Sequence, residues 1–178
     1  MAPKVIQTRR LTLRQPTEAD VETVFGYASD PPVTRLMDWP RLTNQEQVTA
    51  YFAKCSDAWA SGSEYSWILA EPGTDLAIGG IACRVRSTDA DFGYVLSRRH
   101  WGFGFATEAA SAIVAWTFSL PTIRRMWATC DIENMRSARV LEKLGLAREG
   151  LVPGGIIRPN LSPKPRDAYI YAKQRTAA

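Results

Sequence analysis

The sequence has little histidine and little cysteine. His100 is the one histidine among 178 residues, so a catalytic triad or a histidine-rich metal site would have to be built around that single side chain. The three cysteines, Cys55, Cys83 and Cys130, are odd in number, far apart and embedded in apolar segments. This pattern indicates reduced thiols in a core rather than disulfides or metal ligands. Metal-dependent and triad-based chemistry are therefore not favoured.

Long apolar runs and a strong excess of one charge are also missing. No stretch approaches the roughly 20 apolar residues that a membrane helix needs, and the first ten residues lack the apolar middle of a signal peptide. We therefore expect a cytoplasmic protein without a membrane partner. Lysine and arginine total 22 against 18 acidic residues, a net charge of +4, and they are scattered without a base-stacking motif. Nucleic acid is thus not an expected partner, whereas a small anionic ligand is compatible with this charge.

What is present is the composition of a packed globular domain. Hydrophobic residues make up 46% and charged residues 22%, which excludes disorder and repetitive fibrous folds. We find no internal repeat and no linker, and the length suits one domain with a substantial core. The prediction is a single domain over residues 1–178.

The spacing of apolar residues predicts an α/β domain with a mixed sheet. Alternation predicts strands, and helical spacing behind capping residues predicts helices. The predicted elements are a strand at 10–14, helices beginning at Thr17 and Thr43, strands at 67–71, 76–85 and 91–96, a helix at 107–118, a strand at 126–132, a helix at 137–144, and strands at 147–152 and 168–172. Residues 29–32 predict the end of the first helix, and a Pro/Gly/Asn-rich loop is predicted between the last two strands. Residues 91–132 form the predicted parallel strand-helix-strand unit.

The most informative segment lies between the strand at 91–96 and the helix at 107–118. Residues 99–109 read Arg-His-Trp-Gly-Phe-Gly-Phe-Ala-Thr-Glu-Ala. Gly102 and Gly104 let the backbone bend closely around a ligand, and the following helix supplies unpaired N–H groups at its positive end. The segment lacks both the Gly-Lys-Ser/Thr of a Walker loop and the third glycine of a dinucleotide fingerprint. It predicts an anion-binding turn suited to pyrophosphate, with a purely structural turn as the alternative.

Several spaced motifs resemble the GNAT superfamily of acyl-CoA-dependent N-acetyltransferases. Arg99-x-x-Gly102-x-Gly104 is similar to the Gln/Arg-x-x-Gly-x-Gly/Ala signature of that family. Residues 134–150 resemble the Asn-x-x-Ser and Leu-Gly-Phe-x-x-Glu-Gly segment of the branch that contains the ribosomal-protein acetyltransferases RimJ and RimL, and residues 10–14, 29–34 and 93–96 resemble further segments of it. The resemblance implies an α/β (α+β) GNAT fold, with a mixed, mostly antiparallel twisted sheet of about seven strands and about four helices. It also implies a homodimer.

Acetyl-CoA is the cofactor that this resemblance implies. Backbone N–H groups from Trp101 to Ala106 would hold its pyrophosphate, and its pantetheine arm would run along the edge of the strand at 91–96. Either Val95 or Leu96 would donate an N–H to the oxyanion. The implied cofactor-binding residues are Tyr94, Val95, Leu96, Ser97, Arg99, Trp101, Gly102, Phe103, Gly104, Phe105, Ala106, Thr107, Asn134 and Ser137.

The resemblance implies that Ser137 is the general acid that protonates the leaving thiolate. The alternative is that Asn134 and Ser137 only cap a helix. The glutamate base of RimL-like enzymes cannot be carried over, because residues 151–166 contain no acidic side chain. Asp91 is the first substitute and Glu108 the second, with Asp167 behind them, and a structural ion pair is the alternative for each. A base acting through water, or an amine that arrives neutral, would need none of them.

The acceptor should bind between the loop that carries Met37, Asp38 and Trp39 and the Pro/Gly-rich loop before the last strand, although Trp39 and its neighbours could simply anchor their loop. The leading hypothesis is an N-acetyltransferase whose acceptor, a peptide N-terminus or a small-molecule amine, attacks acetyl-CoA directly in a ternary complex. A noncatalytic acyl-CoA-binding sensor is the alternative. An RNA-binding module is a third and weaker interpretation.

Overall fold

Eight strands form one mixed sheet in the computed structural model, which describes residues 2–175. The strand order is β1-β2-β3-β4-β5-β6-β8-β7, and every neighbouring pair is antiparallel except β5 and β6. The strands are β1 (Val5–Gln7), β2 (Thr12–Arg14), β3 (Tyr65–Ala70), β4 (Ala77–Val85), β5 (Asp89–Leu96), β6 (Arg125–Asp131), β7 (Ala147–Arg158) and β8 (Ser162–Gln174). This is the mixed, mostly antiparallel sheet that the resemblance implied, with eight strands where about seven were expected.

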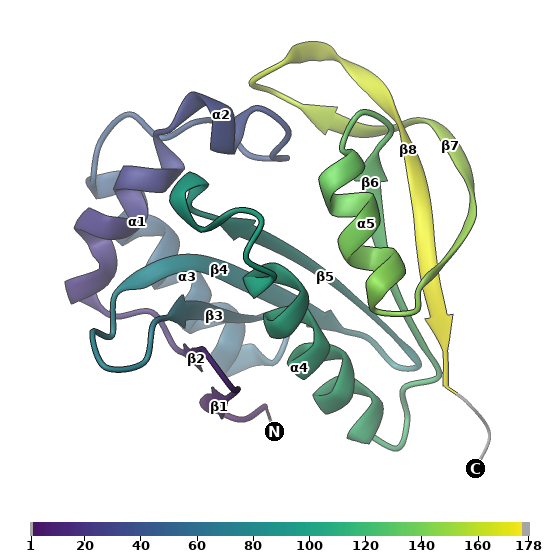
Figure 1. The fold of residues 1–178 in the computed structure, drawn as a ribbon, viewed down its shortest axis with the longest axis horizontal. Coiled ribbons are helices and arrows are strands. Elements are labelled where there is room, and N and C mark those ends of the chain that lie inside the picture. Colours follow the sequence, from purple (N-terminus) through teal and green to yellow (C-terminus); the bar gives the residue numbers. More distant parts are fainter. Residues whose placement is uncertain (1, 176–178) are drawn as a thin grey trace.

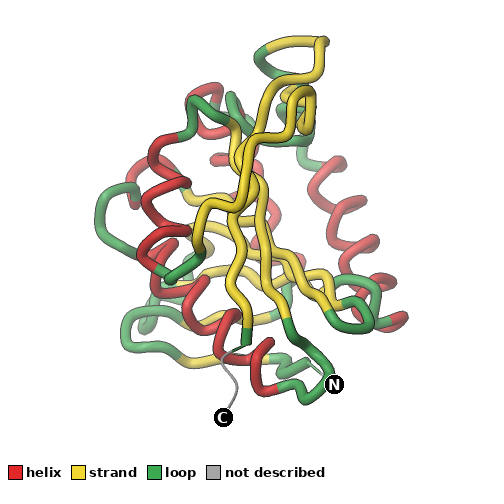
Figure 2. The backbone as a smooth tube through the Cα atoms, turned by 90° about the vertical axis from the view of Figure 1, so that its right-hand side faces the viewer, coloured by secondary structure: helices red, strands yellow, loops and turns green. Residues whose placement is uncertain are grey.

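Helices cover both faces of the sheet (Figures 1 and 2). Helices α4 and α5 lie on one face, and α1 and α3 lie on the other. The helices are α1 (Val21–Ala28), α2 (Pro31–Thr34), α3 (Glu46–Ser61), α4 (Phe105–Ser119) and α5 (Met135–Lys143), and two short 3-10 helices are η1 (Glu18–Asp20) and η2 (Arg98–His100). Within residues 2–175, no helix is long and apolar enough to cross a membrane.

Apolar side chains alternate along the strands and divide the core between the two faces. On the α4/α5 face, Ile113 and Leu141 pack with strand residues such as Phe92, and these side chains are at most 5% exposed. On the α1/α3 face, Val24 and Val48 pack against β3 and β4. Burial of this kind stabilises the domain by about 25 cal/mol per Å² of apolar surface. Both faces of the sheet are therefore held rigidly.

Strands β5 and β6 separate soon after they begin. Their parallel pairing covers three register positions, from Asp89 opposite Arg125 to Asp91 opposite Trp127. Beyond Asp91, β5 pairs only with β4, so its other edge is free as far as Leu96. Helix α4 provides the crossover between the two strands, which confirms the predicted parallel unit. The divergence opens the sheet where the candidate site residues lie.

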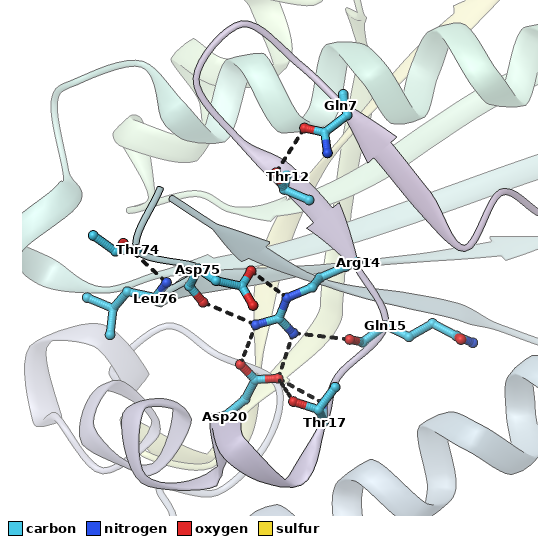
Figure 3. A network of polar contacts seen from close by, with 9 residues as sticks. All are labelled: Gln7, Thr12, Arg14, Gln15, Thr17, Asp20, Thr74, Asp75 and Leu76. Atoms are coloured by element: carbon cyan, nitrogen blue, oxygen red, sulfur yellow. Dashed lines mark hydrogen bonds and ion pairs between the residues drawn. The ribbon is translucent and has the colours of Figure 1, made fainter. Parts of the chain in front are cut away.

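A polar network around Arg14 joins β2, the first helical turn and the turn between β3 and β4 (Figure 3). The Arg14 guanidinium donates to both carboxylate oxygens of Asp20 at 2.7 and 2.8 Å and to Asp75 Oδ1 at 2.8 Å. Asp20 also accepts hydrogen bonds from the backbone N–H and hydroxyl of Thr17, the predicted first capping residue. These bonds hold three distant segments together beside α1.

The prediction of a loop between the last two strands was wrong. Strands β7 and β8 continue through this region and turn between Arg158 and Ser162, with several register shifts. The prolines fit because the hairpin extends past the end of β6, so each strand there has an unpaired edge. Figure 1 shows the hairpin tip reaching toward α2. The Pro/Gly-rich segment is therefore an ordered wall.

Three smaller differences lie near the N-terminus. The strand predicted at 10–14 is shortened to β2, and β1 pairs with it without having been predicted. The first helix ends at Ala28 as expected, but Pro31 begins the short helix α2, since proline fits the first turn of a helix. The helix predicted from Thr43 begins at Glu46, with Gln45 as its N-cap residue, and the Gln47 N–H donates to the Asn44 side chain at 3.1 Å just before it.

The three cysteines are free and buried, which confirms their interpretation as core thiols. Burial raises the pKa of both Cys55 and Cys83 above the ordinary value of a thiol. The same effect raises the pKa of Cys130, although Ser137 and Arg158 oppose it. None of the three is thus a ready nucleophile.

Candidate active site

The glycine-rich turn leads directly into helix α4. Gly102 and Gly104 have φ angles of +87° and +82°, and Gly104 is the residue immediately before the helix. Side chains with a Cβ rarely adopt such angles, so the conformation explains both glycines. Within residues 2–175, no hydrogen-bond partner accepts from the backbone N–H groups of residues 102–107. The turn therefore offers a row of free donors at the positive end of a 15-residue helix.

Glu108 braces this turn against the N-terminal hairpin. Its carboxylate accepts hydrogen bonds from the Thr8 hydroxyl, the Arg10 backbone N–H and the Arg10 Nε, each at 2.7 Å. Arg10 also donates to the carbonyl oxygen of Phe103 at 2.9 Å, and its guanidinium lies 4.6 Å from the centre of the Phe105 ring. Burial opposes ionisation, but these hydrogen bonds hold the pKa of Glu108 below its usual range.

Cationic side chains surround the turn. Arg98 and Arg99 in η2 are exposed, and the Arg136 guanidinium of α5 lies 4.7 Å from the centre of the Trp101 ring. Trp101 itself is not a free donor: its backbone N–H bonds to Arg98, and its indole N–H donates to the Leu96 carbonyl at 2.8 Å. The available N–H groups thus begin at Gly102 rather than at Trp101. The charge and the donors together suit a polyanion.

The free edge of β5 faces the opening between β5 and β6. Donors alternate between the two edges of a strand. The Ser97 N–H donates to the Ile78 carbonyl of β4 at 2.8 Å, so the N–H groups of Val95 and Gly93 also face β4. The N–H groups of Tyr94 and Leu96 consequently point to the free edge. Of the two expected oxyanion donors, the strand geometry favours Leu96 over Val95.

Ser137 lies on the first turn of α5 and is held from two sides. Its backbone N–H donates to the Asn134 side chain at 3.1 Å, so Asn134 does cap the helix. Its hydroxyl accepts from the Tyr94 hydroxyl at 3.0 Å. Burial raises the pKa of Tyr94 to about 12, although the bond to Ser137 opposes it, so Tyr94 stays protonated at neutral pH. Two hydroxyl groups are therefore linked beside the free edge of β5, and no local sequence pattern indicated the bond between Tyr94 and Ser137.

A cleft of about 430 Å³ lies where β5 and β6 diverge. It is lined by residues 91–92 of β5, 127–129 of β6 and 155–157 of β7, together with Asp38 and Arg84. The loop after α2 and the last hairpin thus bound it, where the acceptor was expected. Met37 and Trp39 are not among the lining residues, and Trp39 packs against the core of the α1/α3 face. The structure therefore favours a loop-anchoring role for Trp39.

The first and second carboxylates expected as general base, Asp91 and Glu108, are engaged in ion pairs, whereas the third, Asp167, accepts a hydrogen bond from the Gly154 N–H at 2.9 Å. Asp91 lines the cleft, but it is 3% exposed and its two oxygens contact the guanidinium groups of Arg84 and Arg86. Glu108 lies at the turn, outside the cleft lining, and is ionised by its bonds to Thr8 and Arg10. Either carboxylate would have to break an ion pair before it accepted a proton. Their geometry corresponds to that of structural ion pairs, which was the alternative to a role as general base.

Asn160 fastens the hairpin tip across the cleft to the loop after α2. Its side-chain nitrogen donates to the carbonyl oxygens of Thr34 and Trp39, each at 2.8 Å, and its oxygen accepts from the Arg41 N–H at 2.7 Å. These partners are more than a hundred residues away in sequence, and no local pattern indicated them. The three bonds fix the two walls of the cleft relative to one another.

Comparison with known proteins supports the resemblance to GNAT acetyltransferases. Residues 10–147 match the family model described as an acetyltransferase (GNAT) domain. The uncharacterized N-acetyltransferase p20 of Bacillus licheniformis is 31% identical over 154 residues, which cover 84% of this chain and 85% of p20.

Solved structures agree with this match. A GNAT-family acetyltransferase from Bacillus anthracis has a TM-score of 0.83 and 27% identity, over 96% of this chain and 98% of its own. RimL, a ribosomal L7/L12 α-N-protein acetyltransferase solved in complex with coenzyme A, shares the fold with a TM-score of 0.84 and 19% identity, over 96% and 97% of the two chains. As its sequence motifs predicted, the chain belongs to the GNAT family of acetyltransferases.

Proposed function

We propose that the protein transfers the acetyl group of acetyl-CoA to a primary amine, by direct attack of the amine in a ternary complex. The observation that carries this proposal is the row of free N–H donors over residues 102–107, which lies beside the free edge of β5. Such a row at a helix N-terminus suits a pyrophosphate. The coenzyme A bound to the structurally similar RimL agrees with this choice of ligand.

The same residues then receive roles as cofactor contacts. Gly102 to Thr107 hold the pyrophosphate, with Arg99 as a further cation near it. The free edge of β5 holds the pantetheine arm, and the Asn134 amide nitrogen is available to it as a donor. The thioester supplies the acetyl group when the donor is bound.

Leu96 and Ser137 act on the reacting atoms. The Leu96 N–H stabilises the negative charge that develops on the carbonyl oxygen as the amine nitrogen bonds to the carbonyl carbon. Ser137 gives its hydroxyl proton to the sulfur as the carbon–sulfur bond breaks, and the Tyr94 hydroxyl, which donates to Ser137 Oγ, orients it. The proton that the amine loses passes to water and restores the serine hydroxyl. No free carboxylate is required.

Isothermal titration with acetyl-CoA, followed by acetylation of an amine panel, tests this function. Gly104→Asp should lose acetyl-CoA binding, because a carboxylate at this left-handed position would repel the pyrophosphate and strain the turn. Ser137→Ala should bind acetyl-CoA normally but turn over about 10²-fold more slowly. Folded wild-type protein that binds no acetyl-CoA would refute the proposal. Binding without acetylation of any amine would identify a sensor instead.

A further inference from the structure

Arg158, at the end of β7, is a buried cation whose guanidinium donates no hydrogen bond within residues 2–175. The residue is 6% exposed, and its Nε is fully buried without a hydrogen-bond partner. Its closest carboxylate oxygen is Asp131 Oδ2, which lies 3.9 Å from Nε, beyond hydrogen-bond distance. A guanidinium group has five donors in a planar fork, and burial of unpaired donors is costly. A ligand with acceptor oxygens would satisfy the donors of the Arg158 guanidinium.

Asp131 does not need Arg158 as its counter-ion. The Asp131 carboxylate already accepts two bonds from Arg166, at 2.8 and 3.3 Å, and one from the Glu133 N–H at 2.9 Å. Burial lowers the pKa of Arg158, while the charges of Asp38 and Asp131 oppose this effect. The protein thus maintains a desolvated arginine to which its neighbouring carboxylates make no hydrogen bond.

The position of Arg158 relates it to the acceptor cleft. Arg158 is not itself one of the lining residues, but it directly follows residues 155–157, which line the cleft, and precedes the tip that Asn160 bonds to the loop after α2. Asp38, an exposed carboxylate in the cleft wall, lies within electrostatic range of Arg158.

We propose that Arg158 binds a carboxylate carried by the acceptor, so that the substrate is an amine with an acidic group, such as an amino acid or a peptide with a free carboxylate. This inference rests on the proposed function. The planar fork of arginine matches the two oxygens of a carboxylate. A monoanion suits the site better than a phosphate dianion, because Asp38 and Asp131 already place negative charge nearby. Asp38 can attract the ammonium group of the same molecule.

The test compares dipeptides with their carboxamides, so that the α-amine is the same and only the carboxylate differs. Rates are compared at equal concentrations of neutral amine. We expect kcat/KM to be about 10- to 100-fold higher for the acids, the range for a hydrogen bond to a charged group. Arg158→Met should raise KM for the acids and leave the carboxamides unchanged. Lys164→Gln, which removes an exposed charge from the same hairpin, is the matched control and should keep the preference.

Thermal unfolding separates ligand binding from a structural role. Methionine has a similar length and no unpaired donors, so Arg158→Met should unfold at the wild-type temperature or above it. Equal rates for acids and carboxamides, or an acid preference that survives in Arg158→Met, would overturn the inference. So would acetyl-CoA binding without acetylation of any acid, or equal use of a phosphate-bearing amine. Failure to bind acetyl-CoA would refute the proposed function instead.

Discussion

Replacing Glu108 with glutamine distinguishes a structural role of this residue from a role as catalytic base. In the variant, the remaining oxygen can still accept from the Thr8 hydroxyl and the Arg10 N–H. The new amide NH₂ takes the place of Oε2, which lies 2.7 Å from the Arg10 Nε in the wild type, so it faces another donor. The substitution removes one charge-assisted hydrogen bond and places two donors against each other.

The structure sets the size of this effect. A hydrogen bond to a charged group contributes about 1.5–3 kcal/mol, but the Arg10 side chain is 38% exposed and solvent screens the pair. We therefore expect a loss of about 1–2 kcal/mol in the free energy of unfolding. For a domain of this size this corresponds to a fall in Tm of about 2–8 °C. Glu22→Gln, at an exposed acid without an ion pair within residues 2–175, is the control and should shift Tm by less than about 2 °C.

The stabilisation that Glu108 provides should depend on pH in a definite direction. Because the folded protein lowers the pKa of Glu108, its contribution to stability is complete above the unfolded value of about 4.3 and is lost as pH falls through the folded value. The Tm difference between wild type and Glu108→Gln should therefore be full at pH 7 and narrow below about pH 4. An unchanged Tm, together with a loss of about 10² in kcat at saturating acetyl-CoA, would refute the brace and restore Glu108 as the base.

Two further predictions concern the strands and the cleft. A Cβ at Gly79 would lie 2.4 Å from the Val95 carbonyl oxygen, whereas at Gly80 its nearest neighbour would be 3.5 Å away. Calorimetry should show Gly79→Ala unfolding with about 1–3 kcal/mol less stability and Gly80→Ala close to wild type, and equal Tm values would contradict this close approach. Asn160→Ala removes the three bonds that join the cleft walls, so limited proteolysis within residues 34–41 should accelerate while the Kd for acetyl-CoA stays constant. Unchanged proteolysis would show that the walls are held by other contacts.

The parts of the site that depend on local backbone chemistry could be predicted from the sequence. Two glycines one residue apart before a helix predicted the turn, and their positive φ angles show why glycine is needed. The three-residue spacing of Asn134 and Ser137 offered a helix cap as the alternative to their functional roles, and the observed bond between them is that cap. Each of these inferences needs only neighbouring residues. Motif spacing then placed the local features in one family.

Contacts between distant segments could not be predicted in the same way. Glu108 pairs with Arg10, 98 residues earlier, and a lone glutamate beside a glycine turn is equally compatible with a base or a brace. The last hairpin was missed because its prolines indicate a loop. Their tolerance depends on free strand edges: β7 is the edge strand of the sheet, and β8 has a free edge beyond the end of β6 at Asp131. Periodicity contains no information on where a neighbouring strand ends.

The ion pairs of Asp91 also bear on the choice of acceptor. Asp91 is bound to two arginines, so it does not take the proton of an acceptor that binds beside it. At pH 7.5 about a third of a peptide α-amine is already neutral, against about a thousandth of a lysine or polyamine nitrogen. A cleft of this kind therefore favours an α-amine by a few hundredfold before any contact is made. Arg158, whose guanidinium donates no hydrogen bond within residues 2–175, and the exposed Asp38 add opposite charges to the same region, and together the three features favour a peptide-like substrate over a polycation.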